Sequence, residues 1–238
     1  MNVKDIYSLF QKTKGVVTDT RLSVENSFFV ALKGKNFDGN NFAEEAIKKG
    51  ASYALVNLEF KSKNNNKFIY VNDTLKTLQK LANYHRKIIK TKIIAITGSN
   101  GKTTTKELLN EILSKEFKTF ATEGNLNNHI GVPLSLLNIK KECGYAVIEL
   151  GANHIGEIKE LCEIAEPDFG LITNFGYAHL EGFGSFQGVI KGKSELYDYI
   201  TGKKGRIFIN VDDPIQEKWL NYIPISTYGK TSKADYKI

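Results

Sequence analysis

The chain contains the stretch Ile93-Ile94-Ala95-Ile96-Thr97-Gly98-Ser99-Asn100-Gly101-Lys102-Thr103-Thr104-Thr105, which decides how the residues after it fold. It begins with an apolar, β-branched run, as buried strands do. A glycine turn follows, and a helical pattern begins at Gly-Lys-Thr. Backbone N–H groups in such a turn and at a helix N-terminus bind polyphosphates. The stretch therefore predicts a phosphate-binding loop, in which Lys102 reaches the terminal phosphates and the Thr103 hydroxyl ligates Mg²⁺.

The loop has the shorter of two possible glycine patterns. The full pattern G-x-x-x-x-G-K-[ST] requires glycine at position 96, where this chain has Ile96. The form G-x-x-G-K-T remains, from Gly98 to Thr103. With a strand before it and a helix after it, this form favours binding of a nucleoside triphosphate. The alternative is an ordinary strand-to-helix turn with a solvated Lys102.

Beyond this loop, the sequence alternates between apolar strands and amphipathic helices. Continuous apolar strands separated by helices are typical of a parallel sheet buried on both faces. The fold class is therefore α/β, with a mainly parallel sheet flanked by helices. The predicted strands are residues 93–97, 145–150, 170–174 and 206–210, and the predicted helices are residues 103–116, 156–165, 186–200 and 215–220.

Each predicted strand of this region has a polar residue at or near its end: Thr97, Glu149, Asn174 and Asn210. In open α/β sheets, ligands bind beyond the carboxyl ends of the strands. These residues are what an assembled active site would contain. Alternatively, they mark where strands leave the core, although this explains the carboxylate of Glu149 less well. A carboxylate one strand from a phosphate loop is well placed to hold Mg²⁺.

Residues 1–90 are predicted to form a separate small α/β domain, followed by a second domain at 91–238. The boundary is expected near residues 89–92. A surface loop rich in Asn and Lys is expected at residues 61–67. The predicted strands are residues 27–32, 53–56 and 68–71; the predicted helices are residues 42–50 and a longer one that begins at Asn72 or Asp73 and runs past Tyr84.

The net charge of +7 is concentrated in the first domain. Residues 1–90 contain 16 Lys and Arg against 8 Asp and Glu, whereas residues 91–238 contain 17 against 18. The basic residues are not clustered with interleaved aromatics, so no nucleic-acid binding is expected. A solvated surface or a site for a small anionic ligand explains the surplus better.

The remaining composition is that of a soluble globular chain. No apolar run approaches the roughly 20 residues of a membrane helix, and the N-terminus lacks the apolar core of a signal peptide. Cys143 and Cys162 have no metal-ligand spacing, so both are expected to be reduced and buried. These features predict a cytoplasmic protein without membrane insertion.

Two further segments contain candidate site residues. His179 follows a strand end, although a lone histidine is more often structural. Residues 124–133 contain Asn125, Asn127 and Asn128 between two glycines. This segment is either an ordinary turn, in which Asn and Gly are common, or a loop whose side-chain amides hold a polar substrate.

Taken together, these motifs resemble the Mur ligase family. The phosphate loop is common to that family and to folylpolyglutamate synthases, whereas residues 149–154 and 179–185 favour the type of Mur ligase that joins D-Ala-D-Ala to UDP-N-acetylmuramoyl-tripeptide. The matching segments run in the family's order over nearly the whole chain: residues 18–21, 29–34 with 37–38, 97–103, 124–128, 149–154, 178–185, Lys193 and 210–213.

The resemblance implies binding roles for both domains. The first domain would bind the UDP end of the substrate, ATP would lie on the phosphate loop, and asparagines would hold the substrate near the reaction. The UDP end would lie near Thr18, Asp19, Thr20 and Arg21; ATP would contact Gly98, Ser99, Asn100, Gly101, Lys102, Thr103 and Thr104, with Asn210 near the adenosine; the asparagines would be Asn125, Asn127, Asn128 and Asn153.

The resemblance also implies catalytic roles for Lys102, Glu149, His179 and Lys193. Thr103 and Glu149 would ligate one Mg²⁺, and His179 a second. Lys193 aligns with a lysine that the family carries as a carbamate, an anion that can bind metal. Position alone would instead predict a solvated helix lysine at 193.

The implied reaction activates the tripeptide carboxylate as an acyl phosphate, which the amine of D-Ala-D-Ala then attacks to form an amide. This would be a step of peptidoglycan precursor synthesis by a monomeric enzyme. Family members carry more central domain and a third, C-terminal domain, which this chain lacks. We therefore expect part of a longer protein, with no ligation by these 238 residues alone.

Three alternatives remain open from the sequence. The first is a sister Mur ligase that adds a different amino acid. The second is a P-loop NTPase that is not a ligase, whose phosphate release would not need a muramoyl peptide. The third is a basic nucleic-acid-binding module, whose affinity would fall steeply with salt.

Overall fold

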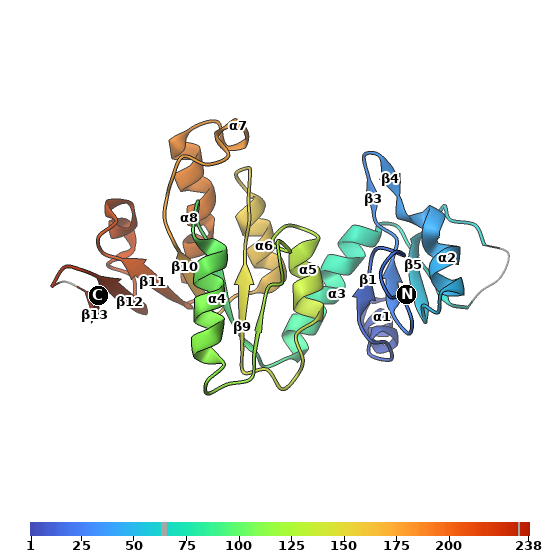
Figure 1. Cartoon of the computed structure of the whole chain (residues 1–238). Coiled ribbons are helices and arrows are strands. Elements are labelled where there is room, and N and C mark those ends of the chain that lie inside the picture. The colour runs from blue at the N-terminus through green and yellow to red at the C-terminus, as the bar shows by residue number, and fades with distance from the viewer. Residues whose placement is uncertain (63–65, 233) are drawn as a thin grey trace. The chain divides into compact units, whose positions relative to one another are not determined.

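The structure is a computed structural model that describes residues 1–62, 66–232 and 234–238. The chain forms two compact units (Figure 1). The first comprises Met1–Ile88 with Leu136–Asn138, and the second comprises Ile89–Ser135 with Ile139–Ile238. Each unit is described by itself below.

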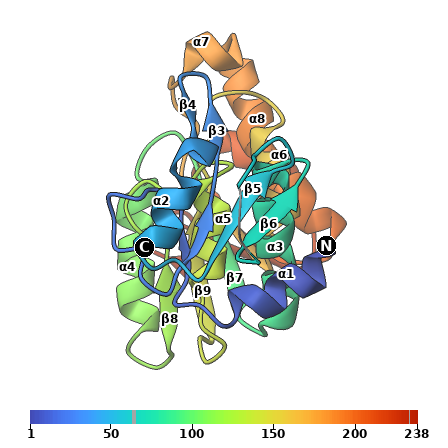
Figure 2. The same cartoon turned by 90° about the vertical axis from the view of Figure 1, so that its right-hand side faces the viewer.

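The first unit is a small parallel sheet covered by helices. Its strand order is β1-β2-β5-β6, and every neighbouring pair is parallel. Figure 2 shows α2 on one side of this sheet and α1 and α3 on the other. The elements are α1 (Val3–Phe10), β1 (Val16–Val17), β2 (Phe28–Val30), an antiparallel hairpin of β3 (Lys33–Gly34) and β4 (Phe37–Asp38), the 3-10 helix η1 (Gly39–Phe42), α2 (Ala43–Lys48), β5 (Tyr53–Asn57), β6 (Phe68–Val71) and α3 (Thr74–Ile88).

Alternation along β2 explains why both faces of this sheet are covered. Successive strand residues point to opposite faces. Phe28 contacts the ring of Phe10 on α1, whereas Phe29 belongs to a cluster with Ala43 and Ala46 on α2. All three residues of β2 are buried. A three-residue apolar strand therefore anchors helices on both of its sides.

The second unit is built on a seven-stranded sheet. Its order is β13-β12-β11-β10-β7-β9-β8, and every neighbouring pair is parallel. The predicted α/β fold with a mainly parallel sheet is thereby confirmed. The strands are β7 (Lys92–Thr97), β8 (Thr119–Ala121), β9 (Tyr145–Glu149), β10 (Phe169–Ile172), β11 (Arg206–Asn210), β12 (Ile225–Gly229) and β13 (Tyr236–Lys237).

Helices flank this sheet. Helix α4 packs against β8 and β9, and α8 packs against β10, β11 and the neighbouring α6. β7 contacts both α4 and α8 and is buried from Ile93 to Thr97, as a strand covered on both faces must be. The helices are α4 (Lys102–Leu113), α5 (Gly131–Leu137), α6 (Glu157–Ala165), α7 (Leu180–Phe183), α8 (Phe186–Gly202) and the 3-10 helix η2 (Pro214–Trp219).

Several local predictions differ in detail from the structure. The short helix predicted at residues 215–220 is the 3-10 helix η2, which begins at Pro214 after an Asp213 side-chain cap. Cys162 is buried as predicted, but Cys143 is only half-buried. Residues 63–65 of the loop predicted at 61–67 lie outside the described residues. Within the described part of the chain, no helix is both long enough and apolar enough to cross a membrane.

Candidate active site

The phosphate loop joins β7 to α4, and glycine is required at both of its ends. Gly98 has φ +145°, and a Cβ added there would lie 1.9 Å from Oγ1 of Thr173. Gly101 has φ +75° at the N-cap of α4. Residues with a side chain rarely adopt a positive φ. The two glycines therefore allow the tight turn between the strand and the helix.

Residues that follow β10 hold the loop in place. Asn174 accepts from the N–H of Asn100 through Oδ1 at 3.1 Å and donates to the carbonyl of Asn100 at 3.0 Å. The hydroxyl of Thr173 donates to the same carbonyl at 2.6 Å. Ser99 exchanges two hydrogen bonds with Gly176 through its hydroxyl, each 2.9 Å long. The polar strand end Asn174 therefore shapes the loop, a role that the sequence did not indicate.

The N-terminus of α4 is available for an anion. The first intrahelical hydrogen bond runs from the N–H of Thr105 to the carbonyl of Gly101. The N–H groups of Lys102, Thr103 and Thr104 precede it and have no helical carbonyl to bind, as at any helix start. Together with the helix dipole, they form an anion-binding position. The Lys102 ammonium lies beside it and donates to the carbonyls of Gly98 at 3.0 Å and Ser99 at 3.3 Å.

The structure brings together the predicted magnesium ligands Thr103 and Glu149. The hydroxyl of Thr103 donates to Oε2 of Glu149 at 3.0 Å, and Asn127 Nδ2 donates to Oε1 at 2.8 Å. Glu149 is only 3% exposed, although it carries a carboxylate. Burial of a charge is costly unless it is hydrogen-bonded or binds a cation. The geometry thus fits a carboxylate prepared for a ligand at the loop.

The donor set at this position suits Mg²⁺. A hydroxyl and a carboxylate are both hard oxygen ligands, and Mg²⁺ usually combines one or two carboxylates with phosphate oxygens and waters. Within the described ranges, no three His, Cys, Asp or Glu side chains gather where they could form a metal site of protein ligands alone. The hydroxyl and carboxylate that are present would suit a Mg²⁺ ion that also binds phosphate oxygens.

A pocket of about 380 Å³ opens beside the loop, and three of the four asparagines predicted to hold the substrate line it. Lys102, Asn127, Asn128, Asn153 and His179 all line it. Asn125 is not among the described lining residues. The remaining lining consists of His129, Gly151, Ala152, Glu157, Glu160 and Leu161.

Lys193 is buried rather than solvated, so the alternative of a solvated helix lysine is wrong. It is 1% exposed on α8, and its ammonium lies 5.4 Å from the ring centroid of Phe183. Burial, and then the charge of Lys102, lower the pKa of Lys193 to about 8. Lys191 on the same helix is exposed. Burial thus makes the neutral amine of Lys193 accessible at a lower pH than that of a free lysine.

Glu195, which the sequence reasoning missed, ties α8 to the segment after β9. Its Oε1 accepts from the N–H of Gly156 at 2.6 Å, and its Oε2 accepts from the N–H of Lys159 at 3.0 Å. Both N–H groups lie at the start of α6, where the helix itself offers no carbonyl to accept from them. The helix that carries Lys193 therefore also fixes the segment of Asn153. Because Glu195 is distant in sequence from the helix start that it caps, no local sequence pattern indicates this contact.

Asn210 lies further along the sheet edge. It ends β11, which is separated from β7 by β10. Its Oδ1 accepts from the N–H of Asp212 at 3.0 Å, and its own N–H donates to Gln216 at 3.2 Å. The side chain thus shapes the turn after β11.

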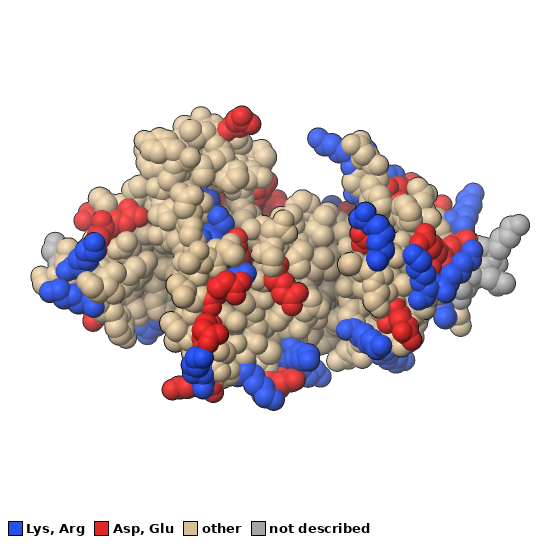
Figure 3. Space-filling view, in the orientation of Figure 1, with Lys and Arg blue, Asp and Glu red and all other residues tan. Residues whose placement is uncertain are grey.

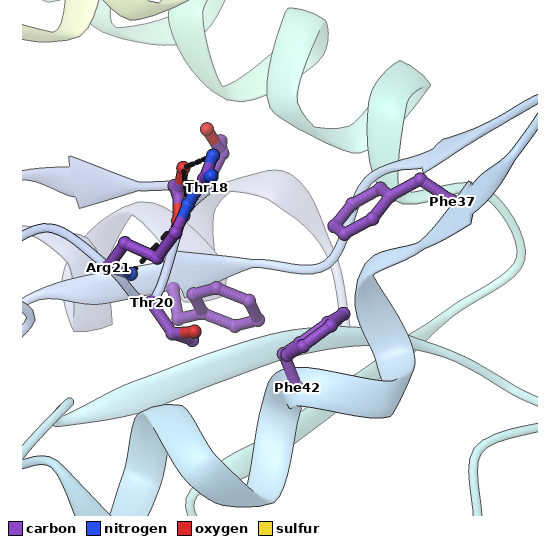
Figure 4. A pocket seen from close by; sticks show the side chains of 7 residues that line it. Thr18, Thr20, Arg21, Phe37 and Phe42 are labelled. Atoms are coloured by element: carbon purple, nitrogen blue, oxygen red, sulfur yellow. Dashed lines mark hydrogen bonds and ion pairs between the residues drawn. The ribbon is translucent and has the colours of Figure 1, made fainter.

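The first unit has a pocket of its own, of about 490 Å³ (Figure 4). The rings of Phe37 and Phe42 line one side of it and stack on each other, with centroids 5.5 Å apart and planes 16° from parallel, although they are 48% and 37% exposed. Residues Thr18, Asp19, Thr20 and Arg21 line it together with Phe29. It therefore combines an apolar wall with polar groups, as small-molecule sites do.

Charge is also arranged in this pocket. Arg21 pairs with Asp19 at 2.6 Å, and its hydrogen bonds lower the pKa of Asp19 to about 2. The guanidinium stays largely exposed and has donors left for an anion. Figure 3 shows further Lys and Arg side chains on the surface of this unit. The pocket thus lies in a basic part of the chain.

Known protein families match both units. Residues 96–238 match the family described as Mur ligase middle domain, and residues 12–86 match the one described as Mur ligase family, catalytic domain. A UDP-N-acetylmuramoyl-tripeptide–D-alanyl-D-alanine ligase of Bacillus subtilis is 36% identical, covering 94% of this chain and 49% of that protein. A ligase of the same name from Escherichia coli is 42% identical, covering 87% and 44%. The chain thus spans about half the length of these relatives.

A solved structure matches as well. The crystal structure of MurF ligase from Thermotoga maritima in complex with ADP superposes with a TM-score of 0.81 at 36% identity. The match covers 92% of this chain and 51% of that one. Both units of the chain therefore have a known structural counterpart.

Proposed function

The chain belongs to the Mur ligase family, as its motifs predicted, and from this premise we propose that it is part of an ATP-dependent ligase that joins D-Ala-D-Ala to UDP-N-acetylmuramoyl-tripeptide. Such an enzyme forms a C–N bond in peptidoglycan precursor synthesis. The observation that carries the proposal is the contact between Thr103 and Glu149 under the phosphate loop. It combines a polyphosphate site with a magnesium ligand pair in a chain whose relatives have this activity in their names.

ATP is proposed to bind at the phosphate loop. The free N–H groups at the start of α4 would bind its phosphates, and Lys102 would leave the loop carbonyls to pair with the terminal phosphate. Thr103 and Glu149 would hold a Mg²⁺ ion. When bound, this ion would supply a positive charge that stabilises the transferring phosphoryl group. The ADP complex of the Thermotoga relative supports nucleotide binding here.

The proposed reaction begins with attack of the tripeptide carboxylate on the γ-phosphate of ATP, which gives an acyl phosphate and ADP. The amine of D-Ala-D-Ala then attacks the acyl carbon, and phosphate leaves as the amide forms. The first step joins two anions. Lys102 would lower the repulsion, because a fixed cation at the loop requires no rearrangement as charge moves. Asn128 and Asn153 line the adjoining pocket and could orient the substrate.

Lys193 and His179 are proposed to complete the site. The neutral amine of Lys193 can add CO₂ to give a carbamate, which changes a cation into an anion. The depressed pKa of Lys193 supports this chemistry, because only the neutral amine reacts. His179 lines the same pocket as Lys102 and would face a second Mg²⁺.

The UDP end of the substrate is proposed to bind in the first unit. The stacked rings of Phe37 and Phe42 would contact a flat base, and Arg21 would contact a phosphate. The basic surplus of residues 1–90 would favour such a polyanion. We further propose that the protein acts as a monomer in the cytoplasm.

The test is ADP release by the natural protein that contains this chain. With ATP and UDP-N-acetylmuramoyl-tripeptide present, release should require D-Ala-D-Ala and yield the amide product. Equal use of a single amino acid instead of the dipeptide would indicate a sister ligase. Phosphate release without the muramoyl peptide would indicate an NTPase that is not a ligase.

A further inference from the structure

Three residues near Glu149 have no role in the proposed reaction. They are Lys106 on α4, Thr122 just after β8, and Asn127 in the following loop. Thr122 and Asn127 contact Glu149, and Lys106 contacts Thr122. We call these three residues the inner brace. Thr103 contacts the same carboxylate from the side of the phosphate loop.

Thr122 holds the backbone of Glu149. Its Oγ1 accepts from the N–H of Glu149 at 3.0 Å, and its own N–H donates to the carbonyl of Val147 at 3.0 Å. Thr122 is 1% exposed. These two bonds continue the pairing of β8 and β9 beyond the last strand residue of β8. They fix how far Glu149 extends from the sheet edge.

Lys106 holds Thr122. Its ammonium is completely buried and donates to the carbonyl of Thr122 at 2.5 Å, with an ion pair to Glu107 at 2.8 Å. A buried charge is expensive, so its retention needs a structural or functional reason. Lys106 lies one helical turn after Thr103, and positions three apart share a helix face. One face of α4 therefore contacts Glu149 directly and supports it from behind.

Asn127 holds the carboxylate itself. Its side-chain amide donates to Oε1 of Glu149, and the Thr103 hydroxyl donates to Oε2. Each carboxylate oxygen therefore accepts a hydrogen bond. Gly151 makes this approach possible, because a Cβ there would lie 2.8 Å from Cγ of Asn127. The carboxylate plane is thereby fixed. This contact differs from the substrate contact that the sequence resemblance implied for Asn127.

We propose that Lys106, Thr122 and Asn127 are positioning residues that hold the Glu149 carboxylate ready for Mg²⁺ and thereby set the Mg²⁺ affinity of the nucleotide complex. The proposal rests on the proposed function of the loop. Partners that orient a metal ligand typically change metal affinity by about 10- to 100-fold when they are removed.

The test measures binding of a fluorescent ADP analogue to the 238-residue chain during titration with Mg²⁺ and, separately, in EDTA. Thr122→Val removes only the hydroxyl, and Thr122→Ser restores it. Asn127→Leu removes the amide donor at similar size. Glu123→Gln, at an exposed neighbour, is the control. Thr122→Val and Asn127→Leu should need about tenfold more Mg²⁺, with unchanged binding in EDTA.

The outcomes separate the brace from the function on which it rests. Wild-type Mg²⁺ dependence in both Thr122→Val and Asn127→Leu would overturn the brace alone. Absence of any Mg²⁺ effect in the wild type would overturn the magnesium site and the brace together. If Thr122→Val does not fold, Asn127→Leu carries the test, because Asn127 is only half-buried. Wild-type behaviour of Thr122→Ser would support the hydroxyl as the operative group.

Discussion

Gly98 lies against Thr173 so closely that the smallest side chain would place its Cβ 1.9 Å from the threonine hydroxyl. The same hydroxyl donates to the carbonyl of Asn100 on the far side of the loop turn. The residue that follows β10 therefore packs directly against the loop that follows the neighbouring strand β7. This contact leads to the first prediction.

Gly98→Ala should destabilise the chain and abolish nucleotide binding at the loop. Alanine at φ +145° costs about 1–3 kcal/mol before the collision with Thr173 is counted. The measurement is the midpoint of thermal unfolding together with ADP binding. Adding Thr173→Ala should recover part of the stability, because it removes the hydroxyl but not the backbone strain. Full recovery of stability in the double variant would contradict the backbone strain. Unchanged stability of Gly98→Ala would contradict both the strain and the collision with Thr173.

Lys102→Met should leave folding intact and remove most of the activity. In the described part of the chain, the ammonium donates to the carbonyls of Gly98 and Ser99 in its own loop, so we expect little packing to be lost. Removal of one group that stabilises a transition state typically costs about 10²–10³-fold in rate. The measurement is product formation by the natural protein that contains the chain, with Lys115→Met as an exposed control near the end of the same helix. A rate within about twofold of wild type would contradict the assigned role.

Lys193 should take up CO₂ in preference to Lys191, and more so as the pH rises through about 8. Burial and Lys102 lower the pKa of Lys193, so its neutral, reactive form dominates above that pH, whereas an ordinary exposed lysine stays charged to higher pH. The measurement is the carbamate carbon signal in NMR with ¹³C-bicarbonate. Lys193→Met should remove the signal and Lys191→Met should retain it. The opposite pattern would show that the wrong lysine was assigned.

Phe37→Ala should weaken binding of the muramoyl substrate without unfolding the first unit. The ring is about half exposed and stacks only on Phe42 among the aromatic contacts described. Loss of aromatic stacking corresponds to about a two- to tenfold change in affinity. Calorimetry with UDP-N-acetylmuramoyl-tripeptide measures this change in affinity. Leu58→Ala, at another exposed apolar residue of the same unit, is the control. Equal affinities for both variants would exclude the aromatic wall as the base site.

The strands that the sequence predicted in the second unit share one property, which is an apolar run between clear turn residues. β8 and β13 lack it. β8 has three half-buried residues, and β13 has two exposed residues at the sheet edge. Their positions depend on backbone pairing with β9 and β12 rather than on side-chain periodicity. Helix α1 was not predicted, although its sequence has a helical pattern: Ile6, Tyr7 and Phe10 are buried at helical spacing after the Asn2 cap.

The site shows the same division between side-chain chemistry and backbone contacts. The placement of Thr103 beside Glu149, with Lys102 on the same loop, could be predicted because the proposed metal and phosphate binding calls for these functional groups. Thr122 and Glu195 could not be predicted, because each acts on a backbone N–H distant in sequence. Any residue can supply that N–H, so no pattern of residue types records the contact.

The position of β7 inside the sheet has a consequence for how the protein folds during synthesis. β7 is the first strand of its sheet in the chain, yet it pairs with β9 and β10, which come much later. Asn100 and its hydrogen-bond partner Asn174 are 74 residues apart in the sequence. Contacts between such distant residues form slowly, because a long loop must close first. A nascent chain that has reached Thr104 but not Asn174 carries the whole predicted phosphate-loop motif and lacks the Asn174 side chain that binds Asn100. Competence to bind nucleotide should therefore emerge late, when β10 joins the sheet.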